Sequence, residues 1–217
     1  MFKVNRSFPA PPSLALRRSY DEEDVVKALA KDFYNKCYIC ETKYPHSIQI
    51  EHFVAHNNND ALKFEWANLF LSCARCNNLK RHHFNNLLNC TDPDVDILRM
   101  IKLAPPSSPG SKATIIAMAT DEKTIETAKL LNKIFNEENT GNKKVAAVSL
   151  RRRVFVEFNK LMQQLNRYID PQSINAERTD ALERIRHLMR IEQEYSAFLR
   201  WAVLEDEEIY NLVEDLL

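Results

Sequence analysis

The chain has 217 residues, of which 45% are hydrophobic and 28% charged, as in an ordinary soluble globular protein. Thirty basic residues balance thirty acidic residues, so the total charge argues against a non-specific nucleic-acid coat. With only two glycines there is no glycine-rich phosphate-binding loop, and no run of about 18 apolar residues could span a membrane. The first residues also lack the apolar core of a secretory signal, so we expect a cytoplasmic protein.

The beginning of the chain predicts an arm followed by a helix. Residues 1–19 contain three prolines among basic and apolar side chains, which predicts an extended arm that packs on the rest of the protein. Asp21 is a candidate cap for a helix that runs to about residue 35. Val25, Leu29 and Phe33 would lie on one face of that helix.

The next segment predicts a small ββα unit. Residues 47–53 alternate polar and apolar side chains as a strand does, and residues 68–72 predict a second strand. An asparagine-rich turn at 57–60 separates the two strands. A helix is expected to follow from residue 77 to about residue 88.

Four of the five cysteines form two CxxC pairs, Cys37 with Cys40 and Cys73 with Cys76. In a reducing compartment this pattern favours a closed, structural zinc site with four thiolates, which would stabilise a unit too small to build its own core. The alternatives are reduced, buried cysteine turns or a redox pair, although a redox pair normally precedes a helix in a βαβ context. The fifth cysteine, Cys90, is expected to be a small buried apolar residue.

Four polar residues in or next to the two predicted strands and the CxxC pairs are candidates for a catalytic site. His52 is a candidate general base, because neutral imidazole can take a proton from water near pH 7. Glu51 and Asn77 offer oxygen ligands of the kind that Mg²⁺ or Mn²⁺ prefers. Asn68 is expected to orient the imidazole or the connecting loop. Taken singly, a histidine beside a glutamate is usually only a surface pair, and an asparagine after a cysteine pair is often only a helix cap.

The second half predicts helices with few or no strands, after a proline-rich loop at 105–111. Residues 143–167 are strongly basic and residues 204–217 strongly acidic, so a basic face could track phosphates, contact an acidic partner or simply be solvated. The expected class is α+β, mostly α. The expected segments are an arm (1–19), a ββα-containing domain (20–103, with its motif at 36–90) and a helical docking domain (112–217).

Residues 37–80 resemble the zinc-ribbon type of HNH endonuclease. The motifs that carry the resemblance are, in order, Cys-x2-Cys, Ile-Glu-His-Phe and Trp-x-Asn-Leu-Phe-Leu-Ser-Cys-x2-Cys-Asn-x2-Lys. The resemblance implies zinc at the four cysteines, His52 as the water-activating base, Glu51 and Asn77 at a catalytic Mg²⁺ or Mn²⁺, and Asn68 as support for the base. Lys80 matches the basic position that closes the family motif and is expected to face phosphate. Arg81, His82 and His83 follow it as further candidates for phosphate contact, and the alternative for the two histidines is a solvated polar face. The chain departs from the family pattern with Glu51 in place of the usual aspartate and Ala55 in place of a proline.

Beyond the motif, the chain is similar to the HNH subunits of Septu-type anti-phage defence systems, some of which accompany retrons. That resemblance implies a nucleic-acid substrate, a partner subunit that is an ABC/SMC-like ATPase, and in some systems a retron reverse transcriptase with its DNA. The absence of a glycine-rich loop agrees with an ATPase on a separate chain. The alternative function is a non-catalytic zinc-ribbon adaptor that binds nucleic acid or protein.

Overall fold

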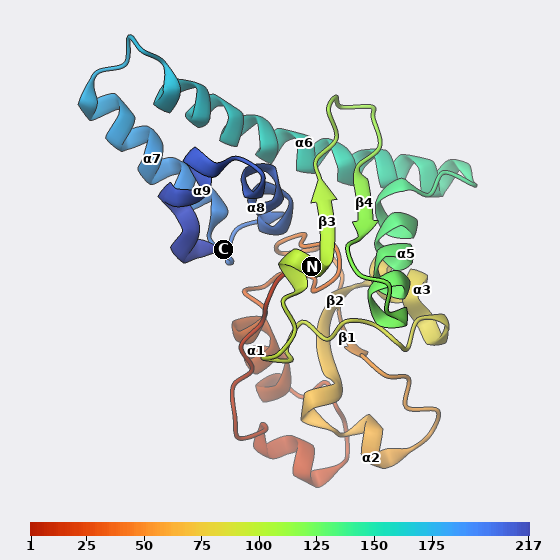
Figure 1. The fold of residues 1–217 in the computed structure, drawn as a ribbon. Coiled ribbons are helices and arrows are strands. Elements are labelled where there is room, and N and C mark those ends of the chain that lie inside the picture. The colour runs from red at the N-terminus through yellow and green to blue at the C-terminus, as the bar shows by residue number, and fades with distance from the viewer.

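The structure, a computed structural model, describes residues 1–217 and has two small sheets among helices (Figure 1). The α-helices are α1 (Glu23–Asp32), α2 (Asp60–Lys63), α3 (Ala74–Lys80), α4 (Ile97–Met100), α5 (Glu122–Asn136), α6 (Gly141–Ile169), α7 (Asn175–Met189), α8 (Ser196–Leu204) and α9 (Glu207–Val213). The strands are β1 (Ile48–His52), β2 (Leu69–Cys73), β3 (Ile101–Ala104) and β4 (Thr114–Ala117). Short 3₁₀ turns occur at Pro12–Leu16, Trp66–Asn68, Arg81–His83 and Glu214–Leu216. The predicted α+β, mostly helical class is confirmed.

The predicted ββα order is present, with different helix ends. β1 and β2 pair antiparallel, with Ile50 opposite Leu71. The helix that follows begins at Ala74, three residues earlier than expected, because the Cys73 sulfur accepts a hydrogen bond from the backbone of the first turn. It ends at Lys80 because Arg81 has a φ of 44°, in the left-handed region that stops an α-helix.

The N-terminal arm is part of the core. Met1, Phe2 and Val4 are buried, and the Val4 amide donates to the Cys90 carbonyl at 2.9 Å. The Arg6 guanidinium lies 4.0 Å from the centroid of the Trp66 ring. The arm therefore packs on the ββα unit as expected, through apolar anchors and a stacked cation.

The cap of α1 differs from the expectation. The N-cap residue is Glu22, whose side chain makes no capping hydrogen bond. Asp21 instead pairs with the Ser19 hydroxyl in the preceding turn. Asp24, in the first turn, accepts from the Ser13 amide at 3.1 Å and so fastens the helix to the arm.

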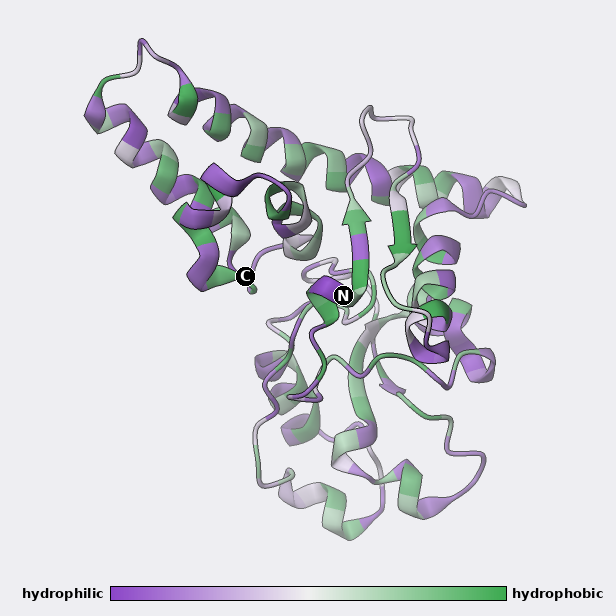
Figure 2. Cartoon of the chain, viewed as in Figure 1, coloured by the Kyte–Doolittle hydropathy of each residue, from purple (hydrophilic) through white to green (hydrophobic).

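The second half contains a hairpin that the sequence did not predict. β3 and β4 pair antiparallel, with Lys102 opposite Ile116, and the proline-rich loop at 105–111 joins them. The hairpin crosses in front of α6, and apolar residues colour much of both strands in Figure 2. Each strand has only four residues, too few for an alternating pattern to show.

One core joins most of the protein. A cluster of 37 buried residues runs from Met1 to Trp201 and draws on the arm, the ββα unit, the hairpin and α5, α6 and α8. A second cluster lies at the far ends of α6 to α9 and is called here the distal helical cluster. Its buried residues are Leu161, Ile185, Met189, Leu199, Val203, Ile209 and Val213. No helix combines the length and apolar character that a bilayer crossing needs.

Candidate functional site

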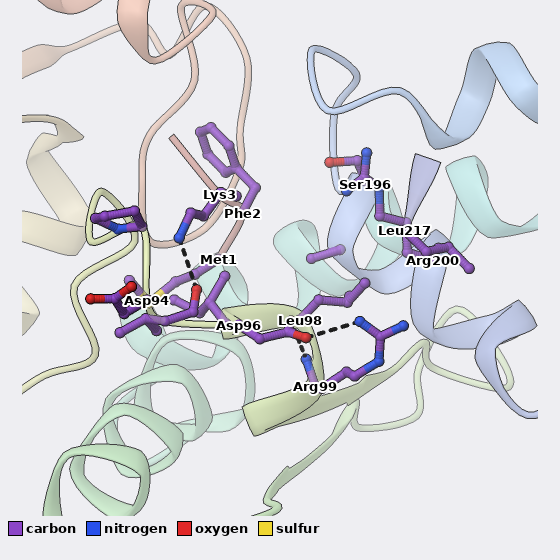
Figure 3. Close-up of a pocket in the computed structure, with 14 residues that line it drawn as sticks. Met1, Phe2, Lys3, Asp94, Asp96, Leu98, Arg99, Ser196, Arg200 and Leu217 are labelled. Carbon is purple, nitrogen blue, oxygen red and sulfur yellow. Dashed lines mark hydrogen bonds and ion pairs between the residues drawn. The ribbon is translucent and has the colours of Figure 1, made fainter. Parts of the chain in front are cut away.

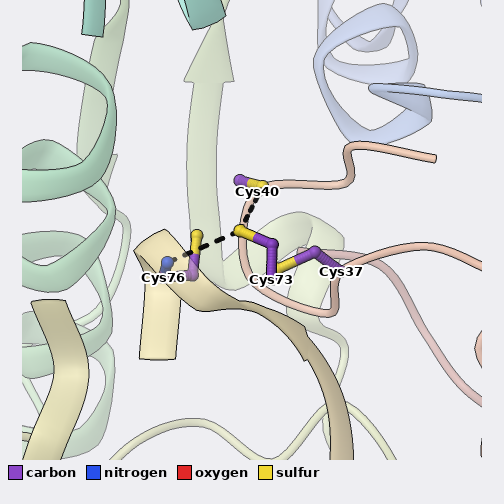
Figure 4. Close-up of side chains that lie close together, drawn as sticks. All are labelled: Cys37, Cys40, Cys73 and Cys76. Carbon is purple, nitrogen blue, oxygen red and sulfur yellow. Dashed lines mark hydrogen bonds between the residues drawn. The ribbon is translucent and has the colours of Figure 1, made fainter. Parts of the chain in front are cut away.

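The four CxxC cysteines come together in space (Figure 4). Their sulfur atoms all lie within 4.8 Å of one another, and those of Cys40 and Cys73 are 3.9 Å apart. A tetrahedral zinc with bonds of about 2.3 Å holds its sulfurs at edges of about 3.8 Å, so both geometry and ligand chemistry fit this ion. The expected four-cysteine cluster is confirmed, and it could hold a zinc ion.

The first CxxC pair, Cys37 and Cys40 (the first knuckle), lies in a tight turn. The Glu41 amide donates to the Cys37 carbonyl at 2.9 Å, and Glu41 has a φ of 61°, which closes a tight turn.

Cys90 is buried outside the cluster, where burial raises the pKa of its thiol to about 12. It therefore behaves as the apolar residue that was expected.

A buried polar network ties this knuckle to α8. The Lys36 ammonium lies 3.2 Å from the Glu41 carboxylate, and the Ser196 hydroxyl donates to the same carboxylate at 3.1 Å. Burial alone would raise the pKa of Glu41, but the Lys36 charge and the chain's amino terminus lower it to about 2. The carboxylate is therefore ionised and fixed between two parts of the chain distant in sequence.

Three of the predicted catalytic residues line one cleft. Glu51, His52 and Asn77 meet Arg81 at a cleft of about 470 Å³ beside the end of β1. Sequence analysis did not predict its other polar lining residues, Tyr20, His56, Asn57 and Asn58. The one available signal was His56, four residues after His52 in a loop rich in turn residues.

His52 is held in a defined orientation. Its Nε2 lies 3.0 Å from the Lys63 carbonyl oxygen, and its ring packs against the rings of Tyr20 and His56 at 4.8 and 4.5 Å between centroids. A carbonyl only accepts, so Nε2 must carry the hydrogen and Nδ1 must carry the lone pair. Burial lowers the pKa of His52, which favours the neutral ring.

Asn68 acts on the loop rather than on the imidazole. Its side-chain oxygen accepts from the Val54 amide at 2.8 Å, and its nitrogen donates to the carbonyls of Val54 and Leu62 at 2.9 and 3.0 Å. Leu62 directly precedes Lys63, whose carbonyl holds His52. The buried amide therefore fixes both ends of the loop that positions the imidazole.

Glu51 lies at the base of the cleft in a buried ion pair. One carboxylate oxygen is 2.6 Å from the Lys80 ammonium, and the other accepts from the Tyr38 hydroxyl at 3.0 Å. Burial raises the pKa of Glu51 to about 7 in spite of the Lys80 charge. Lys80 was expected to face phosphate, but it is 1% exposed and committed to Glu51, because α3 packs its last turn against β1.

The remaining candidates lie around the rim or outside the cleft. The Asn77 amide nitrogen donates to the Gln49 side chain at 2.7 Å, which leaves the Asn77 oxygen available to a ligand. Arg81 is exposed and lines the cleft, as a phosphate contact would. His82 and His83 are exposed, with ring centroids 4.1 Å apart, and are not among the residues that line the cleft.

The basic stretch at 143–167 is largely neutralised within the chain. The ion pairs join Lys143 to Glu137, Arg151 to Glu138, Arg153 to Glu194, Lys160 to Glu157 and Arg167 to Asp180. Arg151 is fully buried, and Arg152 is exposed. The stretch is therefore not a continuous row of free cations, which a phosphate track along α6 would need.

A separate cavity of about 290 Å³ lies where Met1, Lys3 and Leu217 approach the segment before β3 (Figure 3). The Lys3 ammonium donates to the Val95 carbonyl at 3.0 Å. None of the predicted site residues lines this cavity, so it is distinct from the His52 cleft.

Comparisons with models of protein families and with curated proteins found no match for this chain. Its function is therefore inferred from the geometry and chemistry of these sites.

Proposed function

We propose that the protein is a metal-dependent endonuclease of the HNH type that hydrolyses phosphodiester bonds of DNA or RNA. The observation that carries the proposal is the hydrogen bond between His52 Nε2 and the Lys63 carbonyl, which leaves Nδ1 as a base. A lowered pKa keeps this imidazole neutral near pH 7, where a general base must accept a proton.

In the proposed reaction, His52 Nδ1 takes a proton from a water molecule as its oxygen bonds to phosphorus. The bond from phosphorus to the leaving oxygen breaks, and that oxygen is protonated from solvent. Asn68 maintains the loop that holds the imidazole, and Arg81 at the rim is available to a phosphate oxygen.

The oxygen donors of the cleft fit a divalent cation in their chemistry. Glu51 and Asn77 would hold Mg²⁺ or Mn²⁺, because each oxygen of Glu51 accepts one hydrogen bond or ion pair and keeps a second lone pair. When bound, such an ion supplies charge stabilisation for the phosphate and the leaving oxygen. The Lys80 ammonium would have to share the Glu51 carboxylate with it.

The ion pair between Glu51 and Lys80 is the specific observation in favour of the alternative function, a non-catalytic zinc-ribbon adaptor. A carboxylate already neutralised by Lys80 has less need of a metal ion. An adaptor, however, has no need of an imidazole in the basic tautomer at the wall of a cleft. We therefore favour the nuclease.

We further propose that the nuclease acts as the effector of a two-component anti-phage system, with an ATPase subunit and in some systems a retron. The chain's lack of a glycine-rich phosphate loop supports placing ATP hydrolysis on a partner. Purification of the tagged chain from its native host tests this part, because a co-eluting ATPase would support it. A lone chain that cleaves DNA constitutively would contradict it.

The test of catalysis is substitution of His52. His52→Ala and His52→Gln should each lower Mg²⁺- or Mn²⁺-dependent cleavage by about 10²- to 10⁴-fold with zinc content unchanged. The glutamine variant keeps a donor for the Lys63 carbonyl, so it separates the loss of the base from the loss of the hydrogen bond. His82→Ala is the matched control, because His82 is exposed and does not line the cleft. Full activity of both His52 variants would exclude this base.

A further inference from the structure

A second groove lies between the zinc knuckle and α6, near the opposite end of β1 from His52. Its volume is about 590 Å³, and its lining includes Tyr44 and His46 from the segment before β1, Arg75 of α3, and Ser149 and Arg153 of α6. The groove therefore lies between the ββα unit and the helical half. None of these residues belongs to the His52 cleft.

The groove favours an anionic ligand. Two arginines and a histidine line it and no aspartate or glutamate does, although Glu194 beside it pairs with Arg153 and offsets one of these charges. Arg75 uses one guanidinium nitrogen on the Ile134 carbonyl at 2.6 Å, and Arg153 uses one on Glu194, but a guanidinium has five N–H donors. The Arg153 side chain is 47% exposed, so part of it can reach a ligand.

The groove also presents an aromatic ring to solvent. Tyr44 is 68% exposed, and the Lys43 ammonium lies 5.8 Å from the centroid of its ring. Its backbone is fixed, because its φ is 47°, its amide donates to the Asn35 carbonyl at 2.9 Å, and Pro45 follows it. An exposed aromatic ring on a fixed backbone, beside arginines, is an arrangement on which unpaired bases stack.

We propose that this groove binds a segment of single-stranded nucleic acid, with a base stacked on Tyr44 and phosphates at Arg75 and Arg153. Stacking on the ring requires an unpaired base, which favours a single strand over a duplex. The inference rests on the proposed nuclease function. The groove lies near the start of β1 and His52 at its end, and the five residues of this strand span about 13 Å at about 3.3 Å for each residue. The groove would thus hold the substrate strand a few nucleotides from the bond to be cut.

The experiment measures binding without cleavage. Fluorescence anisotropy with labelled DNA and RNA single strands of about 12 nucleotides, and with the DNA duplex, is recorded with no added Mg²⁺ or Mn²⁺. Tyr44→Ala should weaken single-strand binding about 5- to 100-fold, whereas Tyr44→Phe, which keeps the ring, should bind as the parent does. Arg153→Gln should weaken binding and reduce its salt dependence by about one phosphate contact. Lys27→Gln, which removes an exposed charge on α1, should change neither.

The outcomes separate this inference from the proposed function. A parent protein that binds no single strand, that prefers the duplex, or that binds equally well as Tyr44→Ala would overturn the inference, whatever His52 does. Binding that depends on Tyr44, together with unchanged cleavage in the His52 variants, would leave the groove standing and remove the proposed base. The DNA and RNA probes show which strand the groove takes.

Discussion

The ββα unit at residues 36–90, with its four-cysteine cluster, and the distal helical cluster are held together by different means. In the unit, short strands and one two-turn helix surround four cysteine sulfurs and the buried polar side chains of Glu51, Asn68 and Lys80. In the distal cluster, two long helices, α6 and α7, and two short ones, α8 and α9, bury apolar side chains against one another. Buried polar groups stabilise little but define position, whereas apolar contacts stabilise without fixing any single group.

The difference explains where chemistry can be placed. A base that must keep one tautomer needs directed hydrogen bonds, and His52 has such a bond to the Lys63 carbonyl. Nothing in the distal cluster offers that precision. The distal cluster is joined to the rest of the protein by α6, which is long enough to contribute both to that cluster and to the core shared with the ββα unit.

Loss of zinc from the cysteine cluster is expected to have the largest effect, and to affect the two regions differently. Cys40→Ser removes one of four thiolates, so we expect loss of bound zinc and of hydrogen-exchange protection in β1 and β2. Protection in the distal helical cluster should persist, because its contacts are apolar and do not involve the knuckle. Cys90→Ala is the control, since that cysteine is equally buried but outside the cluster. Simultaneous loss of protection in both regions would show that they fold as one unit.

Removing the Asn68 amide is expected to have the next largest effect. Asn68→Ala leaves the Val54 amide and two loop carbonyls without their partner, which should cost about 2–4 kcal/mol of unfolding free energy. Cleavage should fall as well, because the carbonyl that orients His52 is released. Urea denaturation measures the first effect, and Asn78→Ala, an exposed position on α3, should stay within about 0.5 kcal/mol of the parent.

Features set by a sequence motif could be predicted, whereas contacts between distant side chains could not. The cysteine cluster was predictable, because a four-sulfur zinc site needs all of its ligands and the two CxxC pairs supply them. The convergence of His52, Glu51 and Asn77 followed from the motif. The Glu51–Lys80 pair did not, because periodicity shows that a side chain is buried but not which partner it meets. The β3–β4 hairpin was missed since four-residue strands carry too little pattern.

The buried Arg151 of α6 tests how much a buried polar side chain contributes to stability in the helical half. It is 1% exposed and donates to the Phe135 carbonyl at 2.9 Å and to the Glu138 carboxylate at 2.6 Å, which joins α6 to the end of α5. Arg151→Met keeps much of the side-chain volume but loses both bonds, and should cost about 1–3 kcal/mol. Arg152→Met, its exposed neighbour, should cost less than about 0.5 kcal/mol. Equal losses from the two variants would contradict the buried role.

The smallest expected effect concerns the cap of α5. Asp121 accepts hydrogen bonds from the Thr124 hydroxyl at 2.6 Å and the Thr124 amide at 3.0 Å, and these bonds lower the pKa of Asp121 below its usual value. A lowered folded-state pKa means that this stabilisation is present above the unfolded-state pKa and is lost as the pH falls through the folded one.

Thr124→Val removes the hydroxyl but keeps the amide, so the pKa of Asp121 should rise part of the way toward its usual value, as carboxyl NMR titration would show. An unchanged pKa would mean that the amide alone holds the carboxylate. Zinc binding in the ββα unit has an acid dependence of its own, because protons compete with zinc for the thiolates. Acid should therefore displace zinc bound at the four cysteines. In the helical half it should act on exposed carboxylates whose pKa is lowered by hydrogen bonds, such as Asp121 and Asp180.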